Sequence, residues 1–321
     1  MYQEFFGLRE DPFRVNPDPR YLFLTPSTQE ALTSLAYGIR GRYGIIVMTG
    51  EVGTGKTTLL HALLDALRQM RAATAFVFNP RLSVEGLIAS VVADFGISCK
   101  GQAKHEMLAQ LNRWLMDRFH AGQMVVLIID EAQHLSAEAL EEIRLLTNLE
   151  TSTEKLLQIV LSGQPELEQK LRNANLRQLR QRIAIRCRTA ALTSEETQGY
   201  ISKRLQIAGG NGDPVFSPEA IELLHAYSLG IPRVVNLLCT HALIHALADQ
   251  VRPVSAAHIV AVAKEFELDD PDRAAVTVNY AHAEGFERRD KSRHILSNTE
   301  RRSSRAQQPP VFEDASHEPH S

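Results

Sequence analysis

The sequence has few of the features that mark secreted, metal-binding or membrane proteins. Its three cysteines, Cys99, Cys187 and Cys239, lie far apart in 321 residues and show no metal-ligand spacing, which indicates reduced thiols. The longest apolar run covers residues 124–129, the length of a strand and far short of the roughly 20 residues that cross a bilayer. The first residues lack the basic and then apolar pattern of a signal peptide. We therefore expect a cytoplasmic protein without a membrane span.

An excess of positive charge is also missing. Lys and Arg total 35 against 38 Asp and Glu, so the formal net charge is −3. A protein that attracts nucleic acid or anionic lipid through its overall field is basic, so any such surface here must be local. The hydrophobic fraction of 44% and the charged fraction of 23% are ordinary for a globular protein. The length allows two domains, or one domain with an appendage.

Between residues 43 and 192, apolar segments of strand length alternate with amphipathic helical segments. The expected strands cover 43–50, 74–80, 124–131, 156–163 and 183–192. Continuous apolar strands separated by helices are typical of a parallel sheet that is covered on both faces. The sequence therefore predicts an α/β fold with a five-stranded parallel sheet.

The two ends of the chain differ from this alternating region. The first 26 residues are rich in aromatic residues and proline, which favours an extended segment lying along a surface, and Ser27 is expected to cap the helix that follows. After residue 192, segments with capping residues and helical spacing predict a small all-helical domain. The last residues are polar and aperiodic, which predicts disorder. The expected parts are a core with an aromatic extension over 1–194, a helical domain over 195–268 and a disordered tail over 269–321.

The segment after the first predicted strand matches the P-loop pattern G-x-x-x-x-G-K-[ST] and is followed by a helix. Its glycines permit backbone conformations that turn successive N–H groups toward a phosphate, and the helix adds its positive end. Lys56 would contact the β- and γ-phosphates, and the Thr57 hydroxyl would ligate Mg²⁺. A plain strand-to-helix turn would not explain the lysine and the threonine. The predicted nucleotide-binding residues are Gly50, Glu51, Val52, Gly53, Thr54, Gly55, Lys56, Thr57 and Thr58.

Two carboxylates end the third predicted strand. Asp130 would hold Mg²⁺ through water, and Glu131 would polarise the attacking water. Carboxylates at the tip of an apolar strand are costly unless a cation or solvent meets them; the alternative is a solvated pair that caps the next helix. Because a small-molecule kinase would not need the adjacent glutamate as a base, the pair indicates ATP hydrolysis. The expected cofactors are ATP and Mg²⁺.

Residues 176–188, LRQLRQRIAIRCR, contain five arginines, which repel one another unless an anion lies nearby. They come just before and within the fifth predicted strand, on an edge of the sheet that we expect to face away from the chain's own P-loop. Some P-loop proteins work in rings, where a cation at a subunit edge completes the neighbour's site. The stretch is therefore a candidate for such a cation.

Over about residues 1–268 the chain resembles the AAA+ ATPases. The likeness is closest to secretion-associated ATPases of the ExeA or general secretion pathway protein A type, whose shorter relatives include ATPases of MSHA pilus biogenesis and of exosortase gene clusters. The segments that carry it are FFGLREDPF, NPDPRYLFLT, GEVGTGKTTLL, LIIDEAQHLS, LSGQPEL, LRQLRQRI and GIPRVVNLLC.

The resemblance implies further roles. Gln164 looks like the sensor-1 residue that orients water near the γ-phosphate, with a strand-end hydrogen bond as the alternative. Arg182, with Arg180 as the second choice, looks like the arginine finger. Arg233 looks like sensor 2, with a structural ion pair as the alternative. The aromatic N-terminal segment either lines the adenine pocket or packs over the sheet edge.

The function that the resemblance implies is an oligomeric ATPase, a ring or filament, that drives or regulates assembly of a secretion, pilus or exopolysaccharide export machine. Full-length secretion-type members also carry a membrane span and a peptidoglycan-binding domain, which this sequence does not show, so recruitment by a membrane-associated partner is implied. The alternative is a DNA-acting AAA+ ATPase of the transposition-helper type, although nucleic acid is not the favoured partner. A third hypothesis, a nucleotide switch without hydrolysis, conflicts with the presence of both Asp130 and Glu131.

Overall fold

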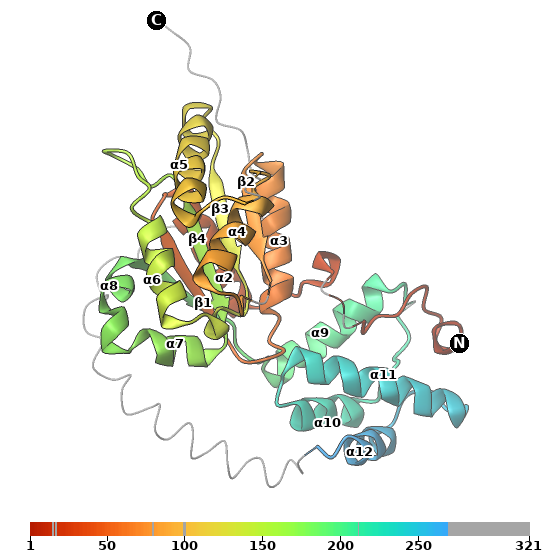
Figure 1. Cartoon of the computed structure of the whole chain (residues 1–321). Helices are drawn as coiled ribbons and strands as arrows, with labels where there is room; N and C mark the ends of the chain where they lie inside the picture. Colours follow the sequence, from red (N-terminus) through yellow and green to blue (C-terminus); the bar gives the residue numbers. More distant parts are fainter. Residues whose placement is uncertain (15, 17, 79, 99–100, 211, 269–321) are drawn as a thin grey trace, which may run out of the picture. The chain divides into compact units, whose positions relative to one another are not determined.

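The structure of the protein is a computed structural model (Figure 1). It describes residues 1–14, 16, 18–78, 80–98, 101–210 and 212–268. The chain divides into two units, Met1–Asp269 and Asp270–Ser321, and the described residues all belong to the first. The tail that the sequence predicts to be disordered, residues 269–321, lies outside the described residues.

Within the described residues, five parallel strands form one sheet in the spatial order β2-β3-β4-β1-β5. Strands β1, β3 and β4 are buried along their whole length, which explains their continuous apolar sequences. The α/β fold with a five-stranded parallel sheet is therefore confirmed. The strands are β1 (Ile45–Thr49), β2 (Ala73–Val77), β3 (Val125–Ile129), β4 (Gln158–Gly163) and β5 (Ile183–Arg188).

Helices cover both faces of the sheet. Because side chains alternate along a strand, neighbours such as Ile45 and Ile46 belong to different apolar layers. One layer lies between the sheet and α2 (Pro26–Arg40) and α3 (Lys56–Gln69). The other contains residues of α4 (Val84–Asp94), α5 (Lys104–His120) and α6 (Ala137–Leu146). These layers fix the carboxyl ends of the strands, where the P-loop and the carboxylates follow.

Several short helices were not predicted from the sequence. Each is too short to show a repeating apolar pattern, so periodicity gives no signal for it. Two of them, α7 (Pro165–Leu171) and α8 (Arg177–Arg182), connect β4 to β5. The others are α1 (Tyr2–Phe5) and the 3₁₀ turns η1 (Pro19–Tyr21), η2 (Ala132–His134) and η3 (Ala174–Leu176).

After β5 the chain forms the helices that we call the helical unit: α9 (Ser194–Ile207), α10 (Pro218–Ser228), α11 (Pro232–Ala248) and α12 (Ala256–Glu265). They share an apolar core separate from the two layers on the sheet. The N-terminal side chains Tyr2, Phe6, Leu8 and Phe13 are buried in this same core. The first residues of the chain therefore pack on the helical unit and not over the sheet edge, while η1 of the same segment contacts α3 on the face of the sheet.

The start of α2 differs from the expectation in its capping residue. The cap is Thr25, whose side chain accepts a hydrogen bond from the backbone of Thr28, while the Thr28 hydroxyl accepts one from the Thr25 backbone. Pro26 occupies the first helical position, where its fixed φ is already helical. The helix thus begins before Ser27, the residue expected to cap it.

No helix among the described residues combines the length and the apolar character needed to span a bilayer.

Candidate functional site

The P-loop motif, residues 50–58, covers the connection from β1 to α3 and the first residues of α3. Gly53 and Gly55 have φ angles of 82° and 90°, in the left-handed region that favours glycine. Gly50 is required for a different reason, because a Cβ there would lie 2.0 Å from the Thr189 Oγ1 atom. The Thr189 hydroxyl in turn bonds that of Thr54 at 2.7 Å. The loop is therefore held against the end of β5, in a conformation that these glycines allow.

Lys56 begins α3 and is buried, with 6% of its surface exposed. Its ammonium group donates hydrogen bonds to the carbonyl oxygens of Gly50 (2.7 Å) and Glu51 (2.9 Å). Burial lowers the pKa of the Lys56 ammonium, while the nearby Glu131 and Asp130 oppose this shift. A cation partly stripped of water and held by neutral carbonyls is suited to bind an incoming phosphate.

Asp130 lies at the end of β3 and is 4% exposed. Its Oδ2 atom accepts a hydrogen bond from the Thr57 hydroxyl at 3.0 Å, and its Oδ1 atom accepts one from the Ser162 hydroxyl at 2.8 Å. The structure thus brings together Thr57 and Asp130, the two predicted metal-site residues. Hydroxyl and carboxylate oxygens are the donor set that Mg²⁺ prefers, so these residues fit that ion. Ser162 was not predicted, although a lone hydroxyl in the apolar strand β4 is its signal.

Glu131 follows in a left-handed backbone conformation with φ of 54°. Its carboxylate accepts hydrogen bonds from the side-chain amides of Gln133 at 2.6 Å and Gln164 at 3.4 Å. Gln164 stands at the end of β4, as the N-cap of α7. The predicted pair Glu131 and Gln164 is therefore adjacent in space, and Gln133, which was not predicted, lies beside both.

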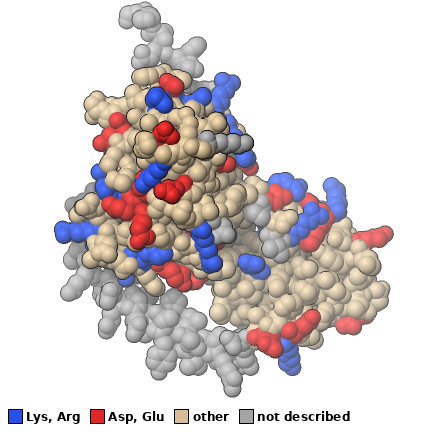
Figure 2. All heavy atoms as spheres, viewed as in Figure 1, with Lys and Arg blue, Asp and Glu red and all other residues tan. Residues whose placement is uncertain are grey.

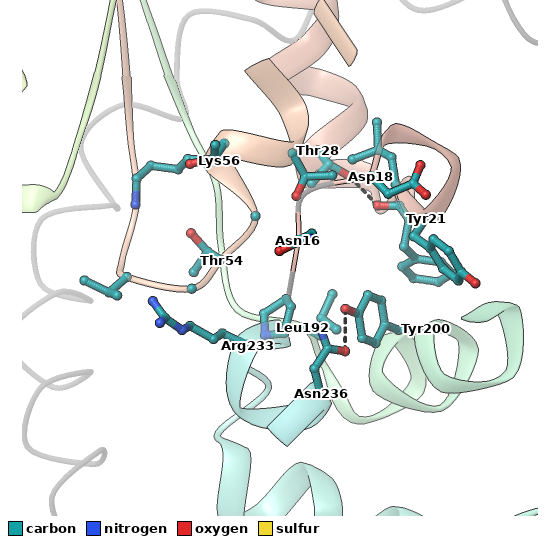
Figure 3. Close-up of a pocket in the computed structure, with 18 of the residues that line it drawn as sticks. Asn16, Asp18, Tyr21, Thr28, Thr54, Lys56, Leu192, Tyr200, Arg233 and Asn236 are labelled. Atoms are coloured by element: carbon teal, nitrogen blue, oxygen red, sulfur yellow. Dashed lines mark hydrogen bonds between the residues drawn. The ribbon is translucent and has the colours of Figure 1, made fainter. Parts of the chain in front are cut away.

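A cavity of about 320 Å³ opens beside these residues. Its lining comes from the P-loop, the N-terminal segment and the helical unit, as Figure 3 shows. Residues of the P-loop, with Glu131 and Gln164, line one part. The part contributed by the N-terminal segment and the helical unit contains Arg14, Asn16, Asp18, Tyr21, Leu22, Phe23, Tyr200, Arg204, Arg233 and Asn236. The segment thus has two roles, since its first residues pack in the helical core and its later residues line the cavity.

Arg233 reaches the P-loop from the start of α11. Its backbone N–H donates to the Gly53 carbonyl at 3.2 Å, and a Cβ on Gly53 would lie 2.8 Å from the Arg233 Cβ. Its guanidinium points toward the P-loop rather than into the helical unit (Figure 3). No ion pair of Arg233 is found among the described residues. The arginine is therefore positioned to meet a phosphate that the loop holds.

Arg204 joins the N-terminal segment to the helical unit and was not predicted. It is 7% exposed, and its guanidinium donates to the Pro12 carbonyl (2.5 Å) and the Tyr200 hydroxyl (2.8 Å). The same group lies over the ring of Tyr21, with 4.5 Å to the centroid. Tyr200 donates in turn to Asn236 on α11 at 2.9 Å (Figure 3). This chain of contacts fixes the wall of the cavity opposite the P-loop.

The candidate arginine fingers lie away from this cavity. Helix α8 ends immediately before β5, whereas the P-loop follows β1; since β1 and β5 are parallel, the two lie at opposite ends of the sheet. The edge strand β5 pairs directly with β1, the strand that leads into the P-loop. Helix α8 is therefore distant from the P-loop because it lies at the other end of these two strands, and not because other strands lie between them. Arg182 donates to the Thr147 hydroxyl at 2.8 Å, and the exposed Arg180 donates to the Arg172 carbonyl at 3.3 Å.

The sequence and the fold both match known proteins. The family described as "AAA domain" matches residues 39–171. General secretion pathway protein A of Aeromonas hydrophila is 45% identical over 249 residues, which are 77% of this chain and 45% of that protein. This chain therefore spans about half the length of its curated relative.

Several solved structures of other proteins have the same fold. The Aeropyrum pernix ORC2 protein superposes with a TM-score of 0.59 at 18% identity, covering 80% of this chain and 71% of that one. Cdc6p of Pyrobaculum aerophilum gives 0.64 at 16% identity with the same coverage, and Thermotoga maritima RuvB gives 0.53 at 17%, covering 76% and 70%. Identities this low show the fold alone. The family match and the 45% identity, together with the P-loop geometry, show that this chain contains an AAA domain similar to that of general secretion pathway protein A.

Proposed function

We propose that this protein hydrolyses ATP to ADP and phosphate with Mg²⁺. The observation that carries the proposal is the convergence, beside one cavity, of a buried lysine, a hydroxyl–carboxylate pair, a second carboxylate and an amide. They come from segments far apart in the chain: Lys56, Thr57, Asp130, Glu131 and Gln164. A structure of the A. pernix ORC2 protein, which shares the fold, contains ADPNP and ADP. We infer that the same class of nucleotide binds in this cavity.

In the proposed reaction, Lys56 and the P-loop N–H groups bind the phosphates, and Arg233 contacts the γ-phosphate from the helical unit. Thr57 and Asp130 would hold the magnesium ion, and this ion would neutralise part of the phosphate charge when bound. Glu131 takes the proton of the attacking water while Gln164 orients that water. The oxygen of the water bonds to the γ-phosphorus, the bond to the bridging oxygen breaks, and ADP leaves. The N-terminal segment and Tyr200 would contact the base.

Phosphate release by the purified protein tests this proposal. Turnover that saturates with ATP, requires Mg²⁺ and stops on chelation is the expected result. Tight ATP binding with no phosphate release at any protein concentration would instead support a nucleotide switch without hydrolysis.

We further propose that the active form is a homo-oligomer, a ring or filament, in which α8 of one subunit reaches its neighbour's nucleotide. The support is the position of α8 at the opposite end of the sheet from its own P-loop, where its arginines cannot serve the same subunit. Arg182 remains the first candidate and Arg180 the second. To act in this way Arg182 has to leave the Thr147 hydroxyl.

We expect Arg182→Ala to lower turnover by about 10³-fold or more while ATP affinity stays unchanged, since arginine fingers contribute about 10³–10⁵ in rate. Arg180→Ala is measured in parallel, and Arg177→Ala, an exposed arginine of the same helix, is the control. Mixing inactive Arg182→Ala subunits with inactive Glu131→Gln subunits should restore part of the activity, because some interfaces then contain both native residues. If neither Arg182→Ala nor Arg180→Ala subunits restore activity when they are mixed with Glu131→Gln subunits, α8 has a structural role only.

For the biological role, we propose that ATP hydrolysis drives or regulates assembly of an envelope export machine through a membrane-associated partner. The support is the 45% identity to general secretion pathway protein A. A DNA-acting role is the second candidate, because structures with the same fold include an A. pernix ORC1 protein in complex with DNA and a RuvB Holliday junction branch migration motor. On the face in Figure 2, Lys and Arg are interspersed with Asp and Glu and form no continuous basic surface.

Duplex DNA should therefore change the ATPase rate by less than about twofold at low and at moderate salt. A DNA-activated enzyme would show strong stimulation that weakens as salt rises, because phosphate contacts release counterions. Strong, salt-sensitive stimulation would favour the DNA-acting function over the export function.

A further inference from the structure

The side chain of Gln133 bridges two parts of the proposed catalytic site. Gln133 is 8% exposed and lies in η2, two residues after Glu131. Its amide nitrogen donates to Glu131 Oε2 at 2.6 Å, and its amide oxygen accepts from the backbone N–H of Gln164 at 3.1 Å. A side-chain amide offers a donor at one atom and an acceptor at the other, and both are used here. One residue thus joins the carboxylate to the residue proposed to orient the water.

The surroundings of Gln133 fix this position. A Cβ on Gly163 would lie 2.8 Å from the Gln133 Oε1 atom, so a glycine at the end of β4 leaves room for the amide. The ammonium of Lys170 on α7 donates to the carbonyl oxygens of Gln133 (2.5 Å) and Leu135 (2.7 Å). Lys170 therefore holds the backbone of this turn, and the missing side chain of Gly163 leaves space for the side chain of Gln133. The amide has little freedom to rotate away.

The backbone conformation of Glu131 explains why the hydrogen bond from Gln133 matters. With φ of 54°, Glu131 lies in a conformation that non-glycine residues rarely adopt, and such strain persists where the surroundings hold it. The His134 ring is 4.0 Å from Glu131 Oε2, and Lys56 and Asp130 lie nearby. Gln133 makes the shorter of the two amide contacts to the carboxylate. It is thus the neutral group best placed to set the direction of that carboxylate.

We propose that Gln133 is a positioning residue for ATP hydrolysis, which orients the Glu131 carboxylate relative to Gln164 so that both address the same water. The inference rests on the proposed hydrolysis at this site. In this proposal Gln133 does not contact the nucleotide. Loss of the amide therefore lowers the rate of the chemical step and leaves nucleotide binding unchanged.

The test compares Gln133→Met with a matched control, Gln158→Met. Gln158 is also a buried glutamine whose amide bridges backbone groups, accepting from Gly44 N–H at 2.9 Å and donating to the Lys155 carbonyl at 3.0 Å, but at the amino end of β4. Gln133→Met should lower kcat by about 10- to 100-fold, the usual effect of losing a group that orients a catalytic ligand, with the ATP Kd within about twofold. Gln158→Met should lower Tm without this loss of kcat.

A double-mutant cycle separates positioning from a general loss of structure. In single-turnover measurements, Gln133→Met added to Glu131→Gln should slow hydrolysis by less than about twofold, because the carboxylate through which Gln133 acts is gone. Equal effects in both backgrounds would overturn the inference, and so would a wild-type kcat in Gln133→Met. If Gln133→Met does not bind ATP, Gln133→Asn, which keeps a neutral amide that is too short to bridge both groups, decides by the same criteria. A wild-type protein without turnover would overturn the proposed hydrolysis itself.

Discussion

Replacing Glu131 with glutamine is expected to slow ATP hydrolysis by about 10²–10⁴-fold and to leave ATP binding intact. A positioned general base contributes about this much to a rate, and glutamine keeps the size of the side chain but cannot accept the proton. Because Lys56, Thr57 and the P-loop are untouched, the Kd for ATP should stay within about twofold of wild type. Phosphate release and the affinity for a fluorescent ATP analogue measure the two quantities separately.

Glu138→Gln provides the matched control for this variant. Glu138 is an exposed glutamate in the first turn of α6, outside the cavity, and its replacement should leave turnover at the wild-type level. The assignment of Glu131 fails if Glu131→Gln turns over ATP as fast as this control. It fails equally if ATP binding is lost together with turnover, since Glu131 would then hold the site together.

Replacing Lys56 with alanine is expected to remove turnover altogether and to weaken ATP binding by about 10- to 100-fold. A charge-assisted hydrogen bond contributes about 1.5–3 kcal/mol, and about 1.4 kcal/mol corresponds to a factor of ten in affinity. The P-loop N–H groups and the start of α3 remain, so some affinity for phosphate should persist. Titration with the fluorescent ATP analogue and assays of phosphate release measure both effects.

The matched control is Lys203→Ala, which removes an exposed lysine of α9 outside the cavity. It should bind and hydrolyse ATP normally. Melting curves in the absence of nucleotide check that Lys56→Ala still folds. Unchanged ATP affinity in a folded Lys56→Ala protein would contradict the proposed phosphate site.

The sequence was most informative where function depends on residues close together in the chain. The P-loop is a continuous segment, and the roles proposed for its lysine and threonine follow from their spacing alone. The apolar strand before Asp130 and Glu131 likewise locates these carboxylates at the edge where parallel strands end. Both predictions needed only local pattern, and the structure brings Thr57 to Asp130 at 3.0 Å.

Features that depend on tertiary contact were not predictable in this way. Arg204 and Pro12 are 192 residues apart, and no local pattern marks either as a partner of the other. Gln133 lies within the LIIDEAQHLS segment, yet the contact on which its proposed role rests forms only because β4 brings Gln164 beside it. The position of β5 next to β1 is also a matter of strand order, which alternating helices and strands leave undetermined.

The shared core of the N-terminus and the helical unit has a mechanical consequence. The first residues are bound to α9–α12 by the buried side chains of Phe6 and Phe13 and by the hydrogen bond from Arg204 to Pro12. Any rotation of those helices relative to the sheet would therefore move the first residues as well. Glu4 is exposed at the surface of this unit. A fluorescent label at Glu4 and a second one on α5 would therefore report such a rotation, with no probe inside the cavity.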